Sequence, residues 1–93
     1  MTSEINDMQR PRLARGVRLQ EDRTRGGYVL LAPERVLNAN ETAVQVLRLC
    51  DGERTVANLI DELTKKFSAE RSRIATDVET LLRDLSAKRM VEL

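Results

Sequence analysis

The chain has 93 residues, enough for one small domain, and its 16 Lys and Arg against 15 Asp and Glu give a formal net charge of +1. This balance argues against a domain built mainly to neutralise nucleic-acid phosphates, because such domains carry a clear basic excess. With no His, one Cys, one Tyr and one Phe, the chain cannot form His-dependent triads, an internal disulfide or a base-stacking platform.

The N-terminal segment, residues 1–15, is polar, contains Pro11 and shows no sustained apolar period. These features predict a flexible arm. Residues 16–93 are then expected to form a single domain, since apolar residues recur there at regular spacings.

Short strands are predicted in the first half of this domain. The first follows Gly16, where apolar and polar residues alternate, and a polar loop closed by two glycines at 26–27 predicts a hairpin. The apolar run Tyr28–Ala32 is expected to lie in the middle of a small sheet with both faces covered. Pro33 ends it, and residues 36–38 are expected to form a third strand, so that the first and third strands are edges.

Helices are predicted after the strands. Asn40 and Thr55 are natural N-caps for the first two, Gly52 is placed to end the first in the left-handed conformation, and the third begins at Ser68 or Glu70. The buried Cys50 is expected near the end of the first helix. The apolar stripes of the last two helices consist of Val56, Leu59, Ile60, Leu63 and Phe67, and of Ile74, Val78, Leu81, Leu82 and Leu85.

The order of strands and helices predicts an α+β fold. More closely, it predicts a small winged-helix-like domain, a three-stranded antiparallel β-meander followed by three α-helices, with the hairpin as the wing. The apolar tail at residues 90–93 is expected to pack back on the sheet.

Catalytic and membrane classes are disfavoured. The chain lacks the commonest general base and metal ligand, and carboxylates such as Asp61 and Glu79 fall on polar helix faces, so we predict no enzyme activity, no metal and no cofactor. No apolar run approaches the roughly 20 residues of a membrane helix. The N-terminus lacks the apolar segment of a secretion signal, so we expect a cytoplasmic protein without a membrane partner.

A winged helix-turn-helix also suggests an alternative function, that of a DNA-binding regulator. In that class the second helix of the unit lies in the major groove. Here that helix carries Arg71 and Arg73, but Asp77, Glu79 and Asp84 on the same helix would repel phosphates. A solvated face of balanced charge is the favoured interpretation, and DNA binding stays the alternative.

The predicted third strand favours another function. An edge strand has unpaired backbone groups that can pair with a guest polypeptide, whose side chains would enter a groove beside the third helix. Arginines at the rim of this groove would favour an acidic ligand. The predicted peptide-binding positions are Val36, Leu37 and Asn38 on the strand, and Arg71, Arg73, Ile74, Ala75 and Val78 on the helix.

Several short runs, in their order and spacing, are similar to those of a known family. The strongest is VLLAPERV at 29–36, and the others are RGVRL at 15–19, NETA at 40–43 and LCDG at 49–52, followed by Arg54 and Thr55 and by the spacing of Ile60, Leu63 and Phe67. From about Pro11 to the C-terminus, the chain resembles the PqqD family of pyrroloquinoline quinone biosynthesis.

The resemblance implies a peptide chaperone without chemistry of its own, of the kind that recognises precursor peptides. Such proteins bind the leader of a precursor between the third strand and the third helix, which here adds Asp77 to the positions above. It implies the precursor PqqA as ligand and the radical S-adenosylmethionine enzyme PqqE as the protein to which PqqA is presented. It implies no nucleic-acid partner, and both a monomer and a homodimer stay open.

Overall fold

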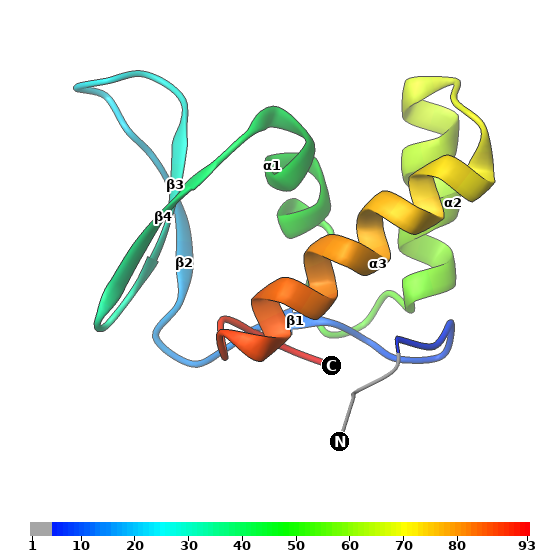
Figure 1. Cartoon of the computed structure of the whole chain (residues 1–93), viewed down its shortest axis with the longest axis horizontal. Helices are drawn as coiled ribbons and strands as arrows, with labels where there is room; N and C mark the ends of the chain where they lie inside the picture. The colour runs from blue at the N-terminus through cyan, green and yellow to red at the C-terminus, as the bar shows by residue number, and fades with distance from the viewer. Residues whose placement is uncertain (1–4) are drawn as a thin grey trace.

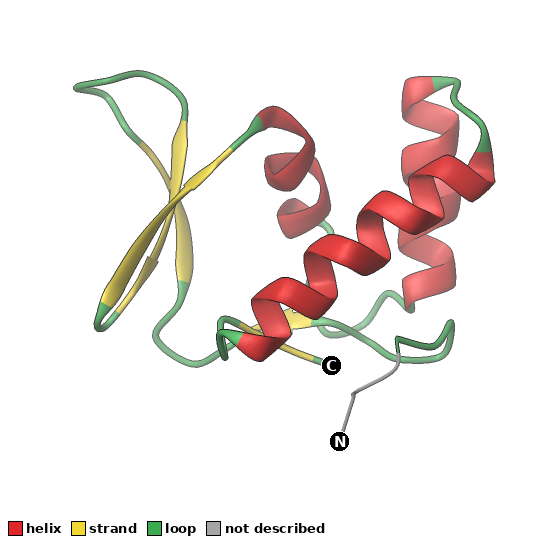
Figure 2. Ribbon diagram, in the orientation of Figure 1, coloured by secondary structure: helices red, strands yellow, loops and turns green. Residues whose placement is uncertain are grey.

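The computed structural model describes residues 5–93 as an α+β domain (Figures 1 and 2). Figure 1 shows the larger sheet at one side, α2 at the opposite side, and α1 and α3 between them. Its elements in chain order are β1 (Arg12–Leu13), β2 (Arg18–Glu21), β3 (Tyr28–Ala32), β4 (Arg35–Ala39), α1 (Glu41–Arg48), α2 (Val56–Phe67), α3 (Arg71–Ala87) and β5 (Val91–Glu92). The predicted antiparallel meander followed by helices is confirmed.

The larger sheet has the order β2-β3-β4, with antiparallel pairing throughout, so β3 is central as predicted. Residues directly opposite in such a sheet share a face. Leu30 lies opposite Leu19 and Leu37, and these three form the face toward the helices. The expectation that β3 is covered on both faces is wrong: Leu30 on the inner face is buried, but Val29 and Leu31 on the outer face are only half-buried.

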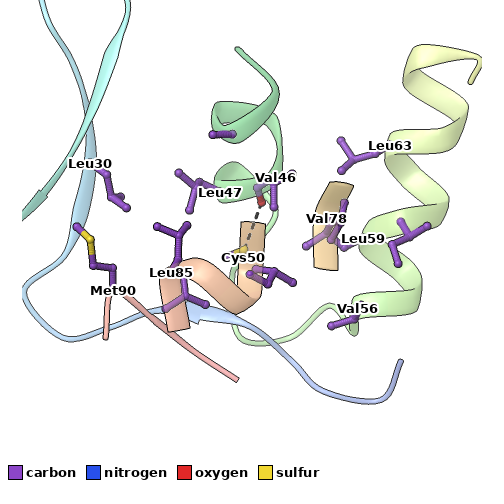
Figure 3. Packing of buried hydrophobic residues seen from close by; sticks show 14 residues of the cluster. Leu30, Val46, Leu47, Cys50, Val56, Leu59, Leu63, Val78, Leu85 and Met90 are labelled. Atoms are coloured by element: carbon purple, nitrogen blue, oxygen red, sulfur yellow. Dashed lines mark hydrogen bonds between the residues drawn. The ribbon is translucent and has the colours of Figure 1, made fainter. Parts of the chain in front are cut away.

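The core lies where the helices meet the inner face of this sheet. Figure 3 shows Leu30, Leu47 and Met90 at the sheet side and Leu59 and Leu63 at the α2 side of one continuous cluster. Phe67, which ends the predicted α2 stripe, is 43% exposed and lies outside this buried cluster.

Cys50 is buried as predicted, and its Sγ donates a hydrogen bond to the Val46 carbonyl at 3.3 Å (Figure 3). Burial, followed by the charge of Asp51, raises the pKa of the Cys50 thiol to about 12. The thiol is therefore protonated at neutral pH and acts as a small core side chain.

The predicted helix starts are confirmed. The Asn40 side chain accepts a hydrogen bond from the Ala43 N–H, and Thr55 and Asn58 form a reciprocal capping box. Gly52 has the expected positive φ of 78°, but it lies beyond the helix cap at Leu49. It therefore forms the turn between α1 and α2 rather than the end of α1.

The folded part of the chain extends back past Gly16, where the sequence placed the domain boundary. β1 pairs with β5, with Arg12 opposite Glu92, and Pro11 is among the fully buried residues. The C-terminal tail pairs with β1 in a second, two-stranded sheet, and its Met90 and Val91 lie in the same buried cluster as Leu30 of the larger sheet. Residues 1–4 of the predicted arm lie outside the described residues.

Candidate functional site

A cleft lies between β4 and the C-terminal half of α3, with a volume of about 170 Å³. Its floor is apolar, because Leu30, Leu47 and Leu85 are buried core residues. At its rim the Lys88 ammonium donates to the Asp84 carboxylate at 3.1 Å, and both side chains are exposed. The lining residues are Leu30, Leu37, Asn38, Ala39, Ala43, Leu47, Leu81, Asp84, Leu85 and Lys88.

The strand that borders this cleft has an open edge. β4 pairs with β3 on one side, and no other strand among residues 5–93 pairs with its second side. Such an edge presents N–H and C=O groups to a further strand. An apolar cleft beside an open edge is the arrangement that strand-adding peptide sites use, with main-chain bonds at the edge and side-chain pockets next to it.

The pairing register identifies which groups of β4 point outward. Two residues separate Ala32 from Arg35, so this pair closes a two-residue hairpin and exchanges main-chain hydrogen bonds. Hydrogen-bonded and non-bonded pairs then alternate along the ladder. The main-chain groups of Val36 and Asn38 therefore face away from β3, while those of Leu37 bond to Leu30.

The three predicted strand positions thus contribute in different ways. The side chain of Leu37 faces the helices and lines the cleft. Val36 lies opposite Leu31 on the outer face and is 62% exposed, so its side chain is outside the cleft. Asn38 borders the cleft, although the register places its side chain with Val29 on the outer face. Of these three residues, only Leu37 has its side chain on the cleft side of the sheet.

None of the predicted helix positions lines this cleft. They are Arg71, Arg73, Ile74, Ala75, Asp77 and Val78, all in the N-terminal half of α3. This half lies over α2 (Figure 1), where the Arg71 Nε donates to the Asp61 carboxylate at 2.8 Å. Val78 is 2% exposed, and Ile74 and Ala75 pack partly buried against the same core.

The helix residues at the cleft lie further along the same element. They are Leu81, Asp84, Leu85 and Lys88, which share one face because their spacing follows the helical period. Leu81 and Leu85 belong to the apolar stripe visible in the sequence. The sequence does not show in which direction α3 runs relative to the sheet. A 17-residue helix is about 25 Å long, so only one of its ends can lie beside the five-residue strand β4, and here it is the C-terminal end.

The exposed face of α3 does not resemble a DNA-reading helix. Arg71 is paired with a carboxylate of α2, and Asp77 and Asp84 are exposed along the helix. Phosphates approaching this face would meet these negative charges. The alternative of a DNA-binding regulator gains no support from this surface.

The cleft combines an apolar floor with one ion pair, between Asp84 and Lys88, at its rim. Within residues 5–93 there is no group of three or more His, Cys, Asp or Glu residues arranged to hold a metal ion. In the same part of the chain, no helix combines the length and apolarity needed to cross a membrane.

Comparisons with known proteins identify the family that the chain resembles in sequence and its structural neighbours. A family model described as coenzyme PQQ synthesis protein D (PqqD) matches residues 27–91. A relative from Rhodopseudomonas palustris, named PqqA binding protein, is 46% identical over 84 residues, which cover 90% of this chain and 82% of the relative.

Two solved structures are also similar. The solution NMR structure of the PqqD truncation of Methylobacterium extorquens PqqCD is described as a functional, stand-alone recognition element for ribosomally synthesised and post-translationally modified peptides. It matches with a TM-score of 0.84 and 39% identity, covering 99% of this chain and 97% of that chain. The crystal structure of PqqD from Xanthomonas campestris matches with a TM-score of 0.62 and 43% identity, covering 87% and 90%.

Proposed function

The chain belongs to the PqqD family, and we propose that it binds the precursor peptide PqqA as an added strand on β4 and presents it to the radical S-adenosylmethionine enzyme PqqE. The observation that carries this proposal is the open edge of β4 beside an apolar cleft. The name of the R. palustris relative, a PqqA binding protein, supports the choice of ligand.

Binding by strand addition divides affinity and specificity between two parts of the site. The outward main-chain groups of Val36 and Asn38 supply hydrogen bonds that any extended peptide can make. Alternate side chains of the guest point toward the cleft, where Leu37, Leu81 and Leu85 select apolar groups. The peptide is thus recognised by an extended backbone with an apolar side chain at the cleft.

Presentation to an enzyme follows from the same geometry. A free precursor loses conformational entropy when it is ordered, and a preformed edge and cleft lower that loss at the enzyme's active site. A carrier that holds PqqA and also docks on PqqE raises the effective concentration of the peptide beside the enzyme. The chain itself is expected to leave the mass of PqqA unchanged, which mass spectrometry of the two-component mixture checks.

The test is an NMR titration of labelled protein with PqqA peptide and, in parallel, with duplex DNA. PqqA is expected to shift the amide signals of β4 and of the α3 turns from Leu81 to Lys88, with smaller shifts at Arg71. Unmoved signals along β4 at saturating PqqA would refute strand addition. DNA binding that weakens steeply with salt and shifts the amide signals of α3 would favour the alternative function, a DNA-binding regulator.

A further inference from the structure

A second hollow continues the cleft past the end of α3. It has a volume of about 420 Å³ and lies between the β3–β4 turn and the segment that joins α3 to β5. Lys88 lines both the cleft and this hollow, so the two are contiguous. The lining residues are Arg15, Val17, Ala32, Pro33, Glu34, Arg35, Lys88, Arg89 and Met90.

The hollow concentrates positive charge in a chain that is nearly neutral. Its charged residues are the cations of Arg15, Arg35, Lys88 and Arg89 and the single carboxylate of Glu34. Among residues 5–93, the three arginines of this group form no ion pair, and Lys88 pairs with Asp84 on the cleft side. We call this hollow, with its four cations, the basic hollow. Since the net charge of the whole chain is only +1, this surface is more positive than the rest of the protein.

The dipole of α3 explains only part of this cluster. A cation at a helix C-terminus is favourable, which accounts for Lys88 and Arg89. Arg15 precedes β2 and Arg35 begins β4, so they reach the hollow from other parts of the chain. The convergence of separate segments on one hollow indicates a ligand of negative charge.

The backbone at Arg89 gives a further reason to expect a negatively charged ligand in the hollow. Its φ of 61° is left-handed, and it follows the α3 cap at Lys88, with the Met90 N–H donating to the Leu85 carbonyl at 2.9 Å. This is a Schellman end, in which glycine is the least strained residue at the position that Arg89 occupies. An arginine therefore stands where the backbone favours glycine, and this residue lines the basic hollow.

The register of β4 connects this hollow with the guest strand. Arg35 lies two residues before Leu37 and faces the same side of the sheet, so the two side chains are about 7 Å apart along the strand. A guest that pairs with β4 and fills the cleft at Leu37 must leave the edge past Arg35. In a sheet that is antiparallel throughout, the end of the guest that passes Arg35 is its C-terminal end.

We infer that the basic hollow binds carboxylate side chains of the guest peptide, located just C-terminal to the segment that pairs with β4. This inference rests on the proposed function and adds a second, electrostatic subsite to it. Carboxylate oxygens suit this hollow because guanidinium groups bind them in a planar, two-point geometry.

The test is calorimetric titration with PqqA peptide at about 50 mM and about 300 mM salt. The variants are Arg89→Gly, Arg35→Gln and their combination, with Arg25→Gln as the matched control. Arg25 lies in the β2–β3 loop, at the opposite end of the sheet from Arg35. Arg89→Gly removes the charge while easing the backbone, so the melting temperature is expected to stay equal or rise.

Each removed charge is expected to weaken PqqA binding about threefold at low salt, and the double variant about tenfold, with a smaller loss at high salt. A PqqA peptide in which every Asp and Glu C-terminal to the segment that pairs with β4 is changed to Asn or Gln is expected to bind the unmodified protein as weakly as PqqA binds the double variant. With this peptide the arginine substitutions are expected to have no further effect.

Three outcomes distinguish failure of the inference from failure of the proposed function. Unchanged affinity in the folded double variant, with PqqA still shifting the β4 amides, would overturn the subsite and leave the strand site standing. No binding of PqqA to the unmodified protein would overturn both. A loss confined to duplex DNA binding, with PqqA affinity intact, would reassign the basic hollow to phosphates and overturn the inference as well.

Discussion

The two halves of α3 carry the same apolar stripe but face different neighbours. The N-terminal half packs against α2, where Val78 is fully enclosed. The C-terminal half lies beside a sheet edge, where Leu81 is half-buried and lines a cleft. An apolar residue on this helix is therefore a core residue or a site residue according to what stands opposite it. α2 covers the apolar stripe in the N-terminal half of α3, whereas the open edge of β4 leaves a cleft beside the C-terminal half.

The sharpest way to break this comparison uses the adjacent residues Leu81 and Leu82. Leu82 is 0% exposed, so Leu82→Ala removes buried contacts and is expected to lower the free energy of unfolding by about 2–5 kcal/mol. Leu81→Ala trims a half-buried side chain and is expected to lower it by about 1 kcal/mol. Urea denaturation of both variants measures the difference, and equal losses would show that the cleft-lining Leu81 is packed as closely as the core residue Leu82.

Peptide affinity is expected to depend on the cleft side of α3 and not on its N-terminal half. Leu81→Ala and Leu37→Ala each remove part of the cleft wall and are expected to weaken PqqA binding about fivefold to thirtyfold, which is about 1–2 kcal/mol. Arg73→Gln, on the exposed surface of the N-terminal half, is expected to leave affinity unchanged. Calorimetry decides: if Arg73→Gln weakens binding as much as Leu81→Ala, the guest lies along the half of the helix that the sequence first indicated.

The main-chain edge allows a finer separation at a single position. Val36→Pro removes an outward N–H and leaves the β3–β4 ladder intact, so PqqA binding is expected to weaken about threefold to tenfold. Val36→Ala trims a side chain that points away from the cleft and is expected to have no effect. Equal affinities for the two variants, measured by calorimetry on folded protein, would mean that the guest makes no main-chain bond at Val36.

Local signals in the sequence were sufficient for most of the fold. Asn40 and Thr55 cap the helices as predicted, because an N-cap bond involves residues three positions apart. The open edge followed from strand order alone. β1 could not be found this way, since its two residues are held by pairing with β5, and the Arg12–Glu92 ion pair at 2.8 Å joins the two ends of the chain.

The site was harder to predict than the fold for the same reason. The sequence shows that Leu81 and Val78 share an apolar stripe, but the crossing of α3 over α2 decides which of them meets β4. That crossing depends on packing between elements and has no short-range pattern. The predicted strand residues lie on β4, which borders the cleft, but the different directions of their side chains could be told only from the pairing register.

The smallest expected effect concerns the turn between α1 and α2, which lies outside the cleft and the basic hollow. Hydrogen bonds from the main-chain N–H groups of Arg54 and Glu53 lower the pKa of Asp51 below its usual 3.8. A carboxyl with a lowered pKa in the folded state stabilises the fold above its unfolded pKa and loses this contribution as pH falls through the folded value.

Stability is therefore expected to fall below about pH 4 more steeply in the unmodified protein than in Asp51→Asn, which has no titrating carboxyl at position 51. Thermal unfolding between about pH 3 and about pH 6 measures the two slopes. Parallel curves would show that the turn is formed without the carboxylate. PqqA affinity at pH 6 and above is expected to be the same in both proteins, because Asp51 lines neither the cleft nor the basic hollow.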